Sequence, residues 1–150
     1  MARRIATPST VSAALAAANP SPGHYRIRNW NSDKYLAIGN SSTANGAPAI
    51  QWEYTGSNGQ LWYLNADRKI VNVASGKCLA IGSGNPDNGI PVVQWEELDS
   101  DSQRWIIDPS TGLIRNVSTG KYLAVGSSST ANGAPVIQWE ATGSDGQRWY

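Results

Sequence analysis

The chain of 150 residues contains no phenylalanine and only one cysteine, one histidine and one methionine. Because Cys78 is alone, it cannot form an intramolecular disulfide and it indicates no particular redox compartment. One histidine and one cysteine are too few for a zinc site with several nitrogen and sulfur ligands, and a histidine-based catalytic triad could use only His24. We therefore expect neither a bound metal nor a cofactor.

Charged residues are also scarce, at 15% of the chain, and twelve basic side chains nearly balance eleven acidic ones. So small a net charge gives no electrostatic reason to expect binding to nucleic acid or to an anionic membrane. No apolar run approaches the roughly 20 residues that span a bilayer, so we expect no membrane insertion. The length suits one domain that buries its own core.

The segment 1–24 differs in composition from the rest of the chain. It starts with Arg3 and Arg4, continues through the alanine-rich stretch 11–18 and reaches Asn19-Pro20. A basic start, an apolar middle and small residues at the end resemble a signal peptide, but interspersed Ser, Thr and Pro make the middle poorly apolar. The favoured interpretation is a short helix that the Asn-Pro pair terminates.

From Tyr25 onward the chain consists of three copies of one unit. Copy 1 reads YRIRNWNSDKYLAIGNSSTANGAPAIQWEYTGSNGQLWYL, copy 2 reads KIVNVASGKCLAIGSGNPDNGIPVVQWEELDSDSQRWII, and copy 3 reads LIRNVSTGKYLAVGSSSTANGAPVIQWEATGSDGQRWY. The equivalent Gln60, Gln103 and Gln147 are 43 and then 44 residues apart. Such self-similarity indicates a repeated structural unit. We expect one domain over 25–150, with repeats at about 25–67, 68–111 and 112–150.

Each copy divides into four short strands separated by turn residues, including an Asn-Gly pair that suits a tight turn. The third strand carries Gln-Trp-Glu and the fourth carries Gln-x-Trp. A propeller usually needs about four to eight blades, and a solenoid needs polar caps at its ends. Three equal copies that close around a pseudo-threefold axis need neither additional blades nor polar caps. The sequence predicts an all-β fold, a β-trefoil of twelve strands, with almost no helix outside the N-terminal segment.

The tryptophans of the fourth strand are predicted to face the core. They alternate with Arg104 and Arg148, which require water on the opposite face of the strand. The inward set is Trp62, Trp105 and Trp149.

The tryptophans of the third strand allow two interpretations. Trp52 shares one face with Ile50, and the other face carries Gln51 and Glu53, so alternation alone predicts a buried indole and an exposed Gln–Glu face. The same holds for Trp95 and Trp139. The other interpretation is a half-exposed platform at the rim of the domain.

The triplets that end in these core tryptophans resemble the threefold Gln-x-Trp signature of ricin B-chain-type lectins. They are Gln60-Leu61-Trp62, Gln103-Arg104-Trp105 and Gln147-Arg148-Trp149. The same domain occurs as a carbohydrate-binding module on bacterial glycoside hydrolases. The resemblance covers Tyr25 to Tyr150 and implies a β-trefoil with up to three shallow sugar sites. It also implies secretion, although the chain shows no convincing signal peptide and no disulfide.

The resemblance also implies which residues would bind sugar. The aromatic platforms would be Trp52, Trp95 and Trp139. The family's acidic residue is replaced by Ala37, Ala80 and Ala124, and its asparagine by Gly59, Ser102 and Gly146. Other polar candidates are Asn45, Asn88 and Asn132 in the Asn-Gly loops, and Asn58, Asp101 and Asp145 one residue before the replaced asparagine.

Three further expectations follow. Carbohydrate binding is the leading function; the alternative, favoured by the lost acidic residue, is a protein-binding trefoil that acts as an inhibitor or assembly module. An enzyme is not expected, because Glu53, Glu96 and Glu140 recur once per copy, whereas a glycosidase needs two carboxylates roughly 5–10 Å apart.

The last strand of copy 3 is short, so we expect the N-terminal segment or a second copy of the chain, in a homo-oligomer, to cover its edge.

Overall fold

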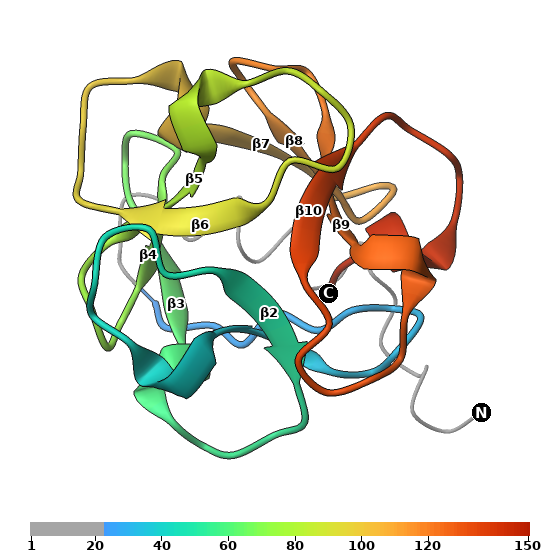
Figure 1. The fold of residues 1–150 in the computed structure, drawn as a ribbon, viewed down its shortest axis with the longest axis horizontal. Helices are drawn as coiled ribbons and strands as arrows, with labels where there is room; N and C mark the ends of the chain where they lie inside the picture. The colour runs from blue at the N-terminus through green and yellow to red at the C-terminus, as the bar shows by residue number, and fades with distance from the viewer. Residues whose placement is uncertain (1–22) are drawn as a thin grey trace.

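The computed structural model describes residues 23–150, which close into three lobes around a central axis (Figure 1). The helix and the signal peptide considered for the N-terminal segment lie outside the described residues. Ten strands are present: β1 (Tyr35–Ile38), β2 (Ala49–Trp52), β3 (Trp62–Leu64), β4 (Ile70–Asn72), β5 (Cys78–Ile81), β6 (Val92–Trp95), β7 (Trp105–Asp108), β8 (Leu113–Asn116), β9 (Tyr122–Val125) and β10 (Val136–Trp139). β2, β6 and β10 surround the centre of the view. The predicted β-trefoil is confirmed.

The count of twelve strands is corrected to ten. The first strand of copy 1 and the last strand of copy 3 appear only as isolated bridges, such as Tyr25 with Trp62 and Asn29 with Trp149. The pairing between the segments of copy 1 and copy 3 involves only residues 148–150 on the side of copy 3 and is assigned as an isolated bridge rather than a ladder.

Each four-stranded sheet combines strands from two successive copies. One sheet has the order β3-β4-β5-β6 and the other β7-β8-β9-β10, while β1 pairs with β2 alone. The last strand of one copy is therefore hydrogen-bonded to the first strand of the next.

Six 3-10 turns of three residues complete the copies, two in each. They are η2 (Gly39–Ser41), η3 (Asn58–Gln60), η4 (Gly82–Gly84), η5 (Asp101–Gln103), η6 (Gly126–Ser128) and η7 (Asp145–Gln147). One turn follows the second strand of each copy and the other precedes the fourth. Within residues 23–150 no helix is long and apolar enough to cross a membrane.

The three fourth-strand tryptophans form the centre of the core, as predicted. Trp62, Trp105 and Trp149 are at most 1% exposed. Each indole N–H donates to the carbonyl of a second-strand leucine, at 2.9, 3.1 and 3.0 Å from Leu36, Leu79 and Leu123 respectively. A buried indole N–H without an acceptor would be destabilising, so this bond selects both the depth and the orientation of each ring.

The edge expected to remain open in copy 3 is paired within the chain. The Arg28 N–H donates to the Tyr150 carbonyl at 2.7 Å, and the Tyr150 N–H donates to the Arg28 carbonyl at 2.9 Å. The Trp30 N–H donates to the Arg148 carbonyl at 2.8 Å. The expectation of an unpaired edge is therefore wrong, because copy 1 pairs with the end of copy 3 and closes the ring. A homo-oligomer stays a prediction.

Replacing a core tryptophan should unfold the domain more readily than replacing a platform tryptophan. We expect Trp105→Ala to lower the free energy of unfolding by about 3–5 kcal/mol, since it removes a fully buried ring and leaves a cavity. Trp95→Ala, at a side chain that is 40% exposed, is the matched control and should lower it much less. Urea unfolding followed by fluorescence compares the two, and equal losses would contradict the assignment of Trp105 to the core.

Cys78 should be chemically inert in the folded protein. Burial and, to a smaller extent, the nearby Glu97 carboxylate raise the pKa of its thiol to about 11. The reactive thiolate is therefore almost absent at pH 8. We expect Ellman's reagent to modify Cys78 at pH 8 only after denaturant is added; rapid modification without denaturant would show that β5 opens readily.

Candidate functional site

Each copy has one open hollow on its outer surface, bounded by the second and third strands and by its two 3-10 turns. Hollow 1 has a volume of about 450 Å³ and lies beside Trp52, hollow 2 about 720 Å³ beside Trp95, and hollow 3 about 500 Å³ beside Trp139. The alanines at the family's acidic position, Ala37, Ala80 and Ala124, line the three hollows. No Asp, Glu or His of the described residues lines any of them.

The third-strand tryptophans are half-exposed, and the glutamines beside them are buried. Trp52, Trp95 and Trp139 are 39, 40 and 38% exposed, whereas Gln51, Gln94 and Gln138 are fully buried. The interpretation based on alternation alone, a buried indole and an exposed Gln–Glu face, is therefore wrong. The platform interpretation describes the structure.

The reason lies in the hydrogen bonds of the glutamine. The Gln94 side-chain amide donates to the carbonyls of Ser42 and Ala44 in copy 1, at 2.8 and 2.9 Å, and its carbonyl oxygen accepts from the Ser75 hydroxyl at 2.7 Å. Gln51 and Gln138 make the same set of bonds: each accepts from a hydroxyl of its own copy and donates to two carbonyls of another, in copy 3 for Gln51 and in copy 2 for Gln138. With every polar group paired, the glutamine is stable inside, and the indole on the opposite face of the strand is turned outward.

Each exposed indole rests on the Asn-Gly turn of a different copy. A Cβ atom built on Gly46 would lie 3.7 Å from the Trp95 ring, and the corresponding distances are 3.6 Å for Gly89 with Trp139 and 3.5 Å for Gly133 with Trp52. These glycines have φ between 84° and 87°, which other residues rarely adopt. The contacts therefore form a cycle: the Asn-Gly turn of copy 1 supports the indole beside hollow 2, that of copy 2 the indole beside hollow 3, and that of copy 3 the indole beside hollow 1.

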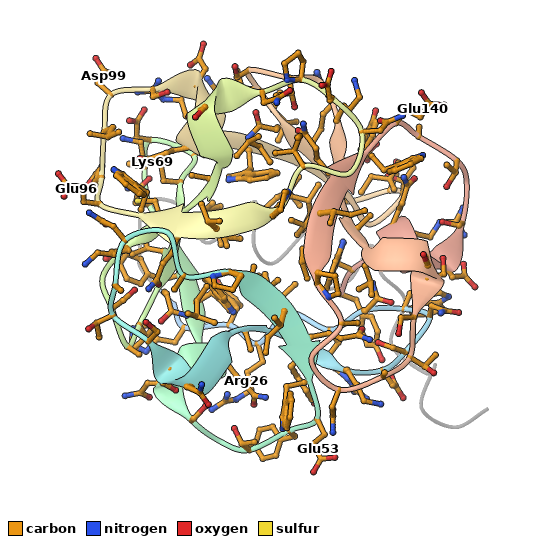
Figure 2. All side chains as sticks on the ribbon, viewed as in Figure 1. Arg26, Glu53, Lys69, Glu96, Asp99 and Glu140 are labelled. Carbon is orange, nitrogen blue, oxygen red and sulfur yellow. The ribbon has the colours of Figure 1, made fainter. Side chains whose placement is uncertain are left out.

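The asparagines of these turns lie at the same contacts between copies, outside the hollows of their own copies. The Asn45 side-chain oxygen accepts from the Glu96 N–H at 2.8 Å, and its amide donates to the Glu96 carboxylate at 3.0 Å. Asn88 holds Glu140 and Asn132 holds Glu53 in the same way. The structure thus places Asn45 beside Trp95 rather than beside Trp52. Figure 2 shows Glu53, Glu96 and Glu140 far apart at the periphery.

The other polar candidates also lie outside the hollows. Asp101 and Asp145 begin η5 and η7 and form ion pairs with Arg104 and Arg148, at 3.0 and 3.1 Å. Asn58 is exposed at the equivalent position of η3. None of these three residues lines a hollow, although Ser57, Ser100 and Ser144, one residue before each of them, do.

The sequence analysis did not pair one serine of each hollow with the residue that it faces. In copies 1 and 3 Ser41 and Ser128 face a glycine: a Cβ atom on Gly146 would lie only 2.6 Å from the Ser128 hydroxyl, and Gly59 is equally crowded by Ser41. In copy 2 the residues are exchanged, with Gly84 facing Ser102. Either arrangement places one serine of the Ser–Gly pair in the lining of the hollow. The reciprocal Ser–Gly exchange was visible in the three aligned copies and could have identified the contact.

The chain matches the family of the ricin-type beta-trefoil lectin domain over residues 23–149. No curated protein sequence matches it. It is similar to the crystal structure of the designed threefold-symmetric protein ThreeFoil, with 33% identity, a TM-score of 0.78, and coverage of 84% of this chain and 95% of that one. It is also similar to the exo-beta-1,3-galactanase 1,3Gal43A of Clostridium thermocellum, with 29% identity, a TM-score of 0.78, and coverage of 87% of this chain and 30% of that one.

The Rhizoctonia solani agglutinin shares the fold, at 22% identity and a TM-score of 0.73 over 85% of this chain and 92% of that one. The family match spans nearly all the described residues and coincides with the threefold closure of Figure 1. The chain therefore belongs to the ricin-type β-trefoil lectin domain family.

Proposed function

We propose that the chain is a multivalent carbohydrate-binding module in which each of the three hollows binds a sugar weakly and without catalysis. The observation that carries the proposal is the repeated pairing of a half-exposed indole with an open hollow, in Trp52, Trp95 and Trp139. The apolar face of a pyranose can stack on such a ring while its hydroxyls bond to the polar atoms of the hollow.

The polar contacts in these hollows would be made by serine, threonine and backbone groups. Alanine at positions 37, 80 and 124 removes the carboxylate that would bind two sugar hydroxyls at once. Neutral hydroxyl donors form weaker bonds than a charged acceptor does. We therefore expect dissociation constants on the order of 1 mM for each hollow, or about −4 kcal/mol.

Useful affinity would then come from several hollows engaging one polysaccharide or glycan-covered surface. Figure 2 shows that Glu53, Glu96 and Glu140, which follow the three platform tryptophans, lie on different sides of the domain. A flexible or repetitive ligand can reach more than one of them, and linked sites can raise the overall affinity by roughly 10²–10⁴. The absence of acidic groups from the hollow linings of residues 23–150 supports binding without glycosidic cleavage.

Truncating one platform should weaken binding without unfolding the protein. We expect Trp52→Ala to reduce the retention of the protein on a glycan array or an insoluble polysaccharide by roughly tenfold or more, because one of three linked sites is lost. The free energy of unfolding should fall by only about 1 kcal/mol. Tyr54→Ala, at an aromatic side chain that is 59% exposed but outside hollow 1, is the matched control and should retain full binding.

The same assay separates sugar binding from the alternative, a protein-binding trefoil. The triple variant Trp52→Ala, Trp95→Ala, Trp139→Ala should bind no glycan that the parent protein binds. If no glycan is bound by the parent protein, the carbohydrate proposal is wrong; a partner protein that the triple variant still captures would then support the alternative.

The asparagine of one copy should control the hollow of another. We expect Asn45→Ala to weaken sugar binding in hollow 2 roughly fivefold, the effect of losing about 1 kcal/mol of hydrogen bonding that holds Glu96 beside Trp95. Hollow 1, in the same copy as Asn45, should be unaffected. NMR titration of variants that retain a single platform measures each hollow separately, and a loss confined to hollow 1 would contradict the cyclic arrangement.

A further inference from the structure

The first strand of each copy carries one residue that faces away from the core, between two neighbouring strands. It is Arg28 in copy 1, Val71 in copy 2 and Arg115 in copy 3. Val71 is apolar and buried, at 3% exposed, so it needs no polar partner. Arg115 lies in the sheet segment β7-β8-β9, where it pairs with Ile106 on one side and with Tyr122 on the other (Figure 1). The two arginines differ in what surrounds them.

In copy 1 the guanidinium of Arg28 is enclosed by groups of the same chain. It lies over the rings of Tyr35 and Tyr150, 5.2 and 5.3 Å from their centroids, and it contacts the Asp33 carboxylate at 2.9 Å. The Tyr150 hydroxyl donates to the same carboxylate at 2.7 Å. Aromatic faces and a carboxylate both stabilise a guanidinium. Copy 1 therefore shows which partners an arginine at this position accepts, namely two rings and one anion.

In copy 3 two of these three partners are missing. Tyr122 keeps the first tyrosine, but Ile106 stands where copy 1 has its second tyrosine, and Gly120 stands where copy 1 has its aspartate. Among residues 23–150 no group forms a hydrogen bond or an ion pair with the guanidinium of Arg115. This cation is half-buried and lacks the anion that its counterpart has.

A pocket opens at this position in the outer surface of the sheet. Its volume is about 340 Å³, and Arg115 and Tyr122 line it together with the apolar Ile106, Pro109 and Leu113. We call it the sheet pocket. None of its residues lines hollow 1, 2 or 3, so it is separate from the proposed sugar sites.

One carboxylate also lines the sheet pocket, but its own turn already engages it. Asp108 accepts from the hydroxyl and the backbone N–H of Ser110, at 2.7 and 2.9 Å, and these bonds lower the pKa of its carboxyl. It pairs with Leu113, two residues along the strand from Arg115, or roughly 7 Å away. The pocket therefore has a positive and a negative end, and a ligand must place its anion at the Arg115 end.

We propose that the sheet pocket docks a segment of a partner protein that carries an aromatic side chain next to a carboxylate. The carboxylate pairs with Arg115 as Asp33 pairs with Arg28 in copy 1. The ring packs on Ile106 and covers the guanidinium, as the Tyr150 ring does in copy 1. The partner thus supplies the two groups that copy 3 lacks, and an aromatic ring seated in a pocket is a common anchor of protein interfaces.

The lining of the sheet pocket favours such a segment over a further sugar. Apart from Arg115, Asp108 and Tyr122, the residues that line it are apolar. A pyranose needs hydrogen-bonding partners for several hydroxyls, and these walls would leave most of them without one. A neutral sugar also brings no anion for the guanidinium, and a charged acceptor forms a bond about twice as strong as a neutral one does.

The test uses N-acetyltyrosine as the probe, because it combines one aromatic ring with one carboxylate. N-acetyltyrosinamide keeps the ring without the charge, and N-acetylalanine keeps the charge without the ring. In an NMR titration of the whole chain we expect N-acetyltyrosine to shift the signals of Arg115 and Tyr122. It should bind roughly fivefold more tightly than the amide, the factor that one partly exposed ion pair contributes. N-acetylalanine should cause no shift over the same concentrations.

Two variants should abolish the preference for the acid by different routes. Arg115→Gln removes the cation. The double variant Ile106→Tyr, Gly120→Asp restores the residues of copy 1, so that the chain itself fills the pocket. A Cβ atom built on Gly120 has no neighbour within 4 Å, and Asp33 already adopts a similar φ, 64° against 73°. Arg68→Gln, which removes an exposed arginine outside the pocket, is the matched control and should bind as the parent does. Thermal unfolding of each variant checks that the fold is retained.

A selection of short random peptides displayed on phage tests the chemistry of the partner. The parent protein should enrich peptides in which an aromatic residue lies close to Asp or Glu, and Arg115→Gln should not enrich them. The triple variant Trp52→Ala, Trp95→Ala, Trp139→Ala should enrich the same peptides as the parent, because the sheet pocket is separate from the three hollows.

Several results would overturn the docking site. They are equal binding of N-acetyltyrosine and its amide, a preference that survives Arg115→Gln, and enriched peptides that lack either the ring or the acid. A glycan that shifts the signals of Tyr122 in the parent protein, where the peptides do not, would assign the pocket to sugar instead. The sheet pocket does not depend on the proposed sugar binding, so its failure leaves the three hollows as they are.

Discussion

The structure depends on one contact that is made three times, between the third-strand glutamine of one copy and a loop of another. For Gln94 the backbone N–H donates to the Ala47 carbonyl at 3.0 Å, its carbonyl accepts from the Gly46 N–H at 2.8 Å, and its buried amide bonds to two further loop carbonyls. A buried amide that lost these partners would be strongly destabilising. The contact therefore requires all three copies, since each supplies the loop that completes the next.

This contact also creates the platforms. Inserting the glutamine into the neighbouring loop turns the adjacent tryptophan outward, and the Asn-Gly turn of the same loop then supports the ring and holds the following glutamate. Each platform ring consequently rests on a second copy, although the hollow beside it is lined mainly by residues of its own copy. Asn45, Asn88 and Asn132, which were predicted to bind sugar, hold the glutamates that follow the platform tryptophans. Their role in sugar binding stays a prediction.

The threefold arrangement leaves room for the copies to diverge around a shared centre. The core tryptophans and buried glutamines are the same in all three copies, because each completes the packing of its neighbours. The outer loops are not constrained by packing between copies in this way. Beside hollow 2, Asp67 at the end of copy 1 forms an ionic network with Lys69 and Arg104 of copy 2, and Lys69 also holds the carbonyl of the exposed Leu98. The other two hollows have no equivalent of Lys69, since Arg26 and Leu113 occupy its position.

The sequence by itself determined the architecture. Three copies with a fixed period, with Trp105 and Trp149 each next to an arginine on the fourth strand, require a closed threefold fold with those rings inside. Two of the twelve predicted strands are absent because residues 148–150 offer copy 1 too short a partner. Only the tertiary structure decided which face of the third strand is buried, because alternation shows that Gln94 and Trp95 face opposite ways but not which of them finds partners. Those partners, Ser42 and Ala44, lie about 50 residues away in another copy, and only folding brings them within hydrogen-bonding distance.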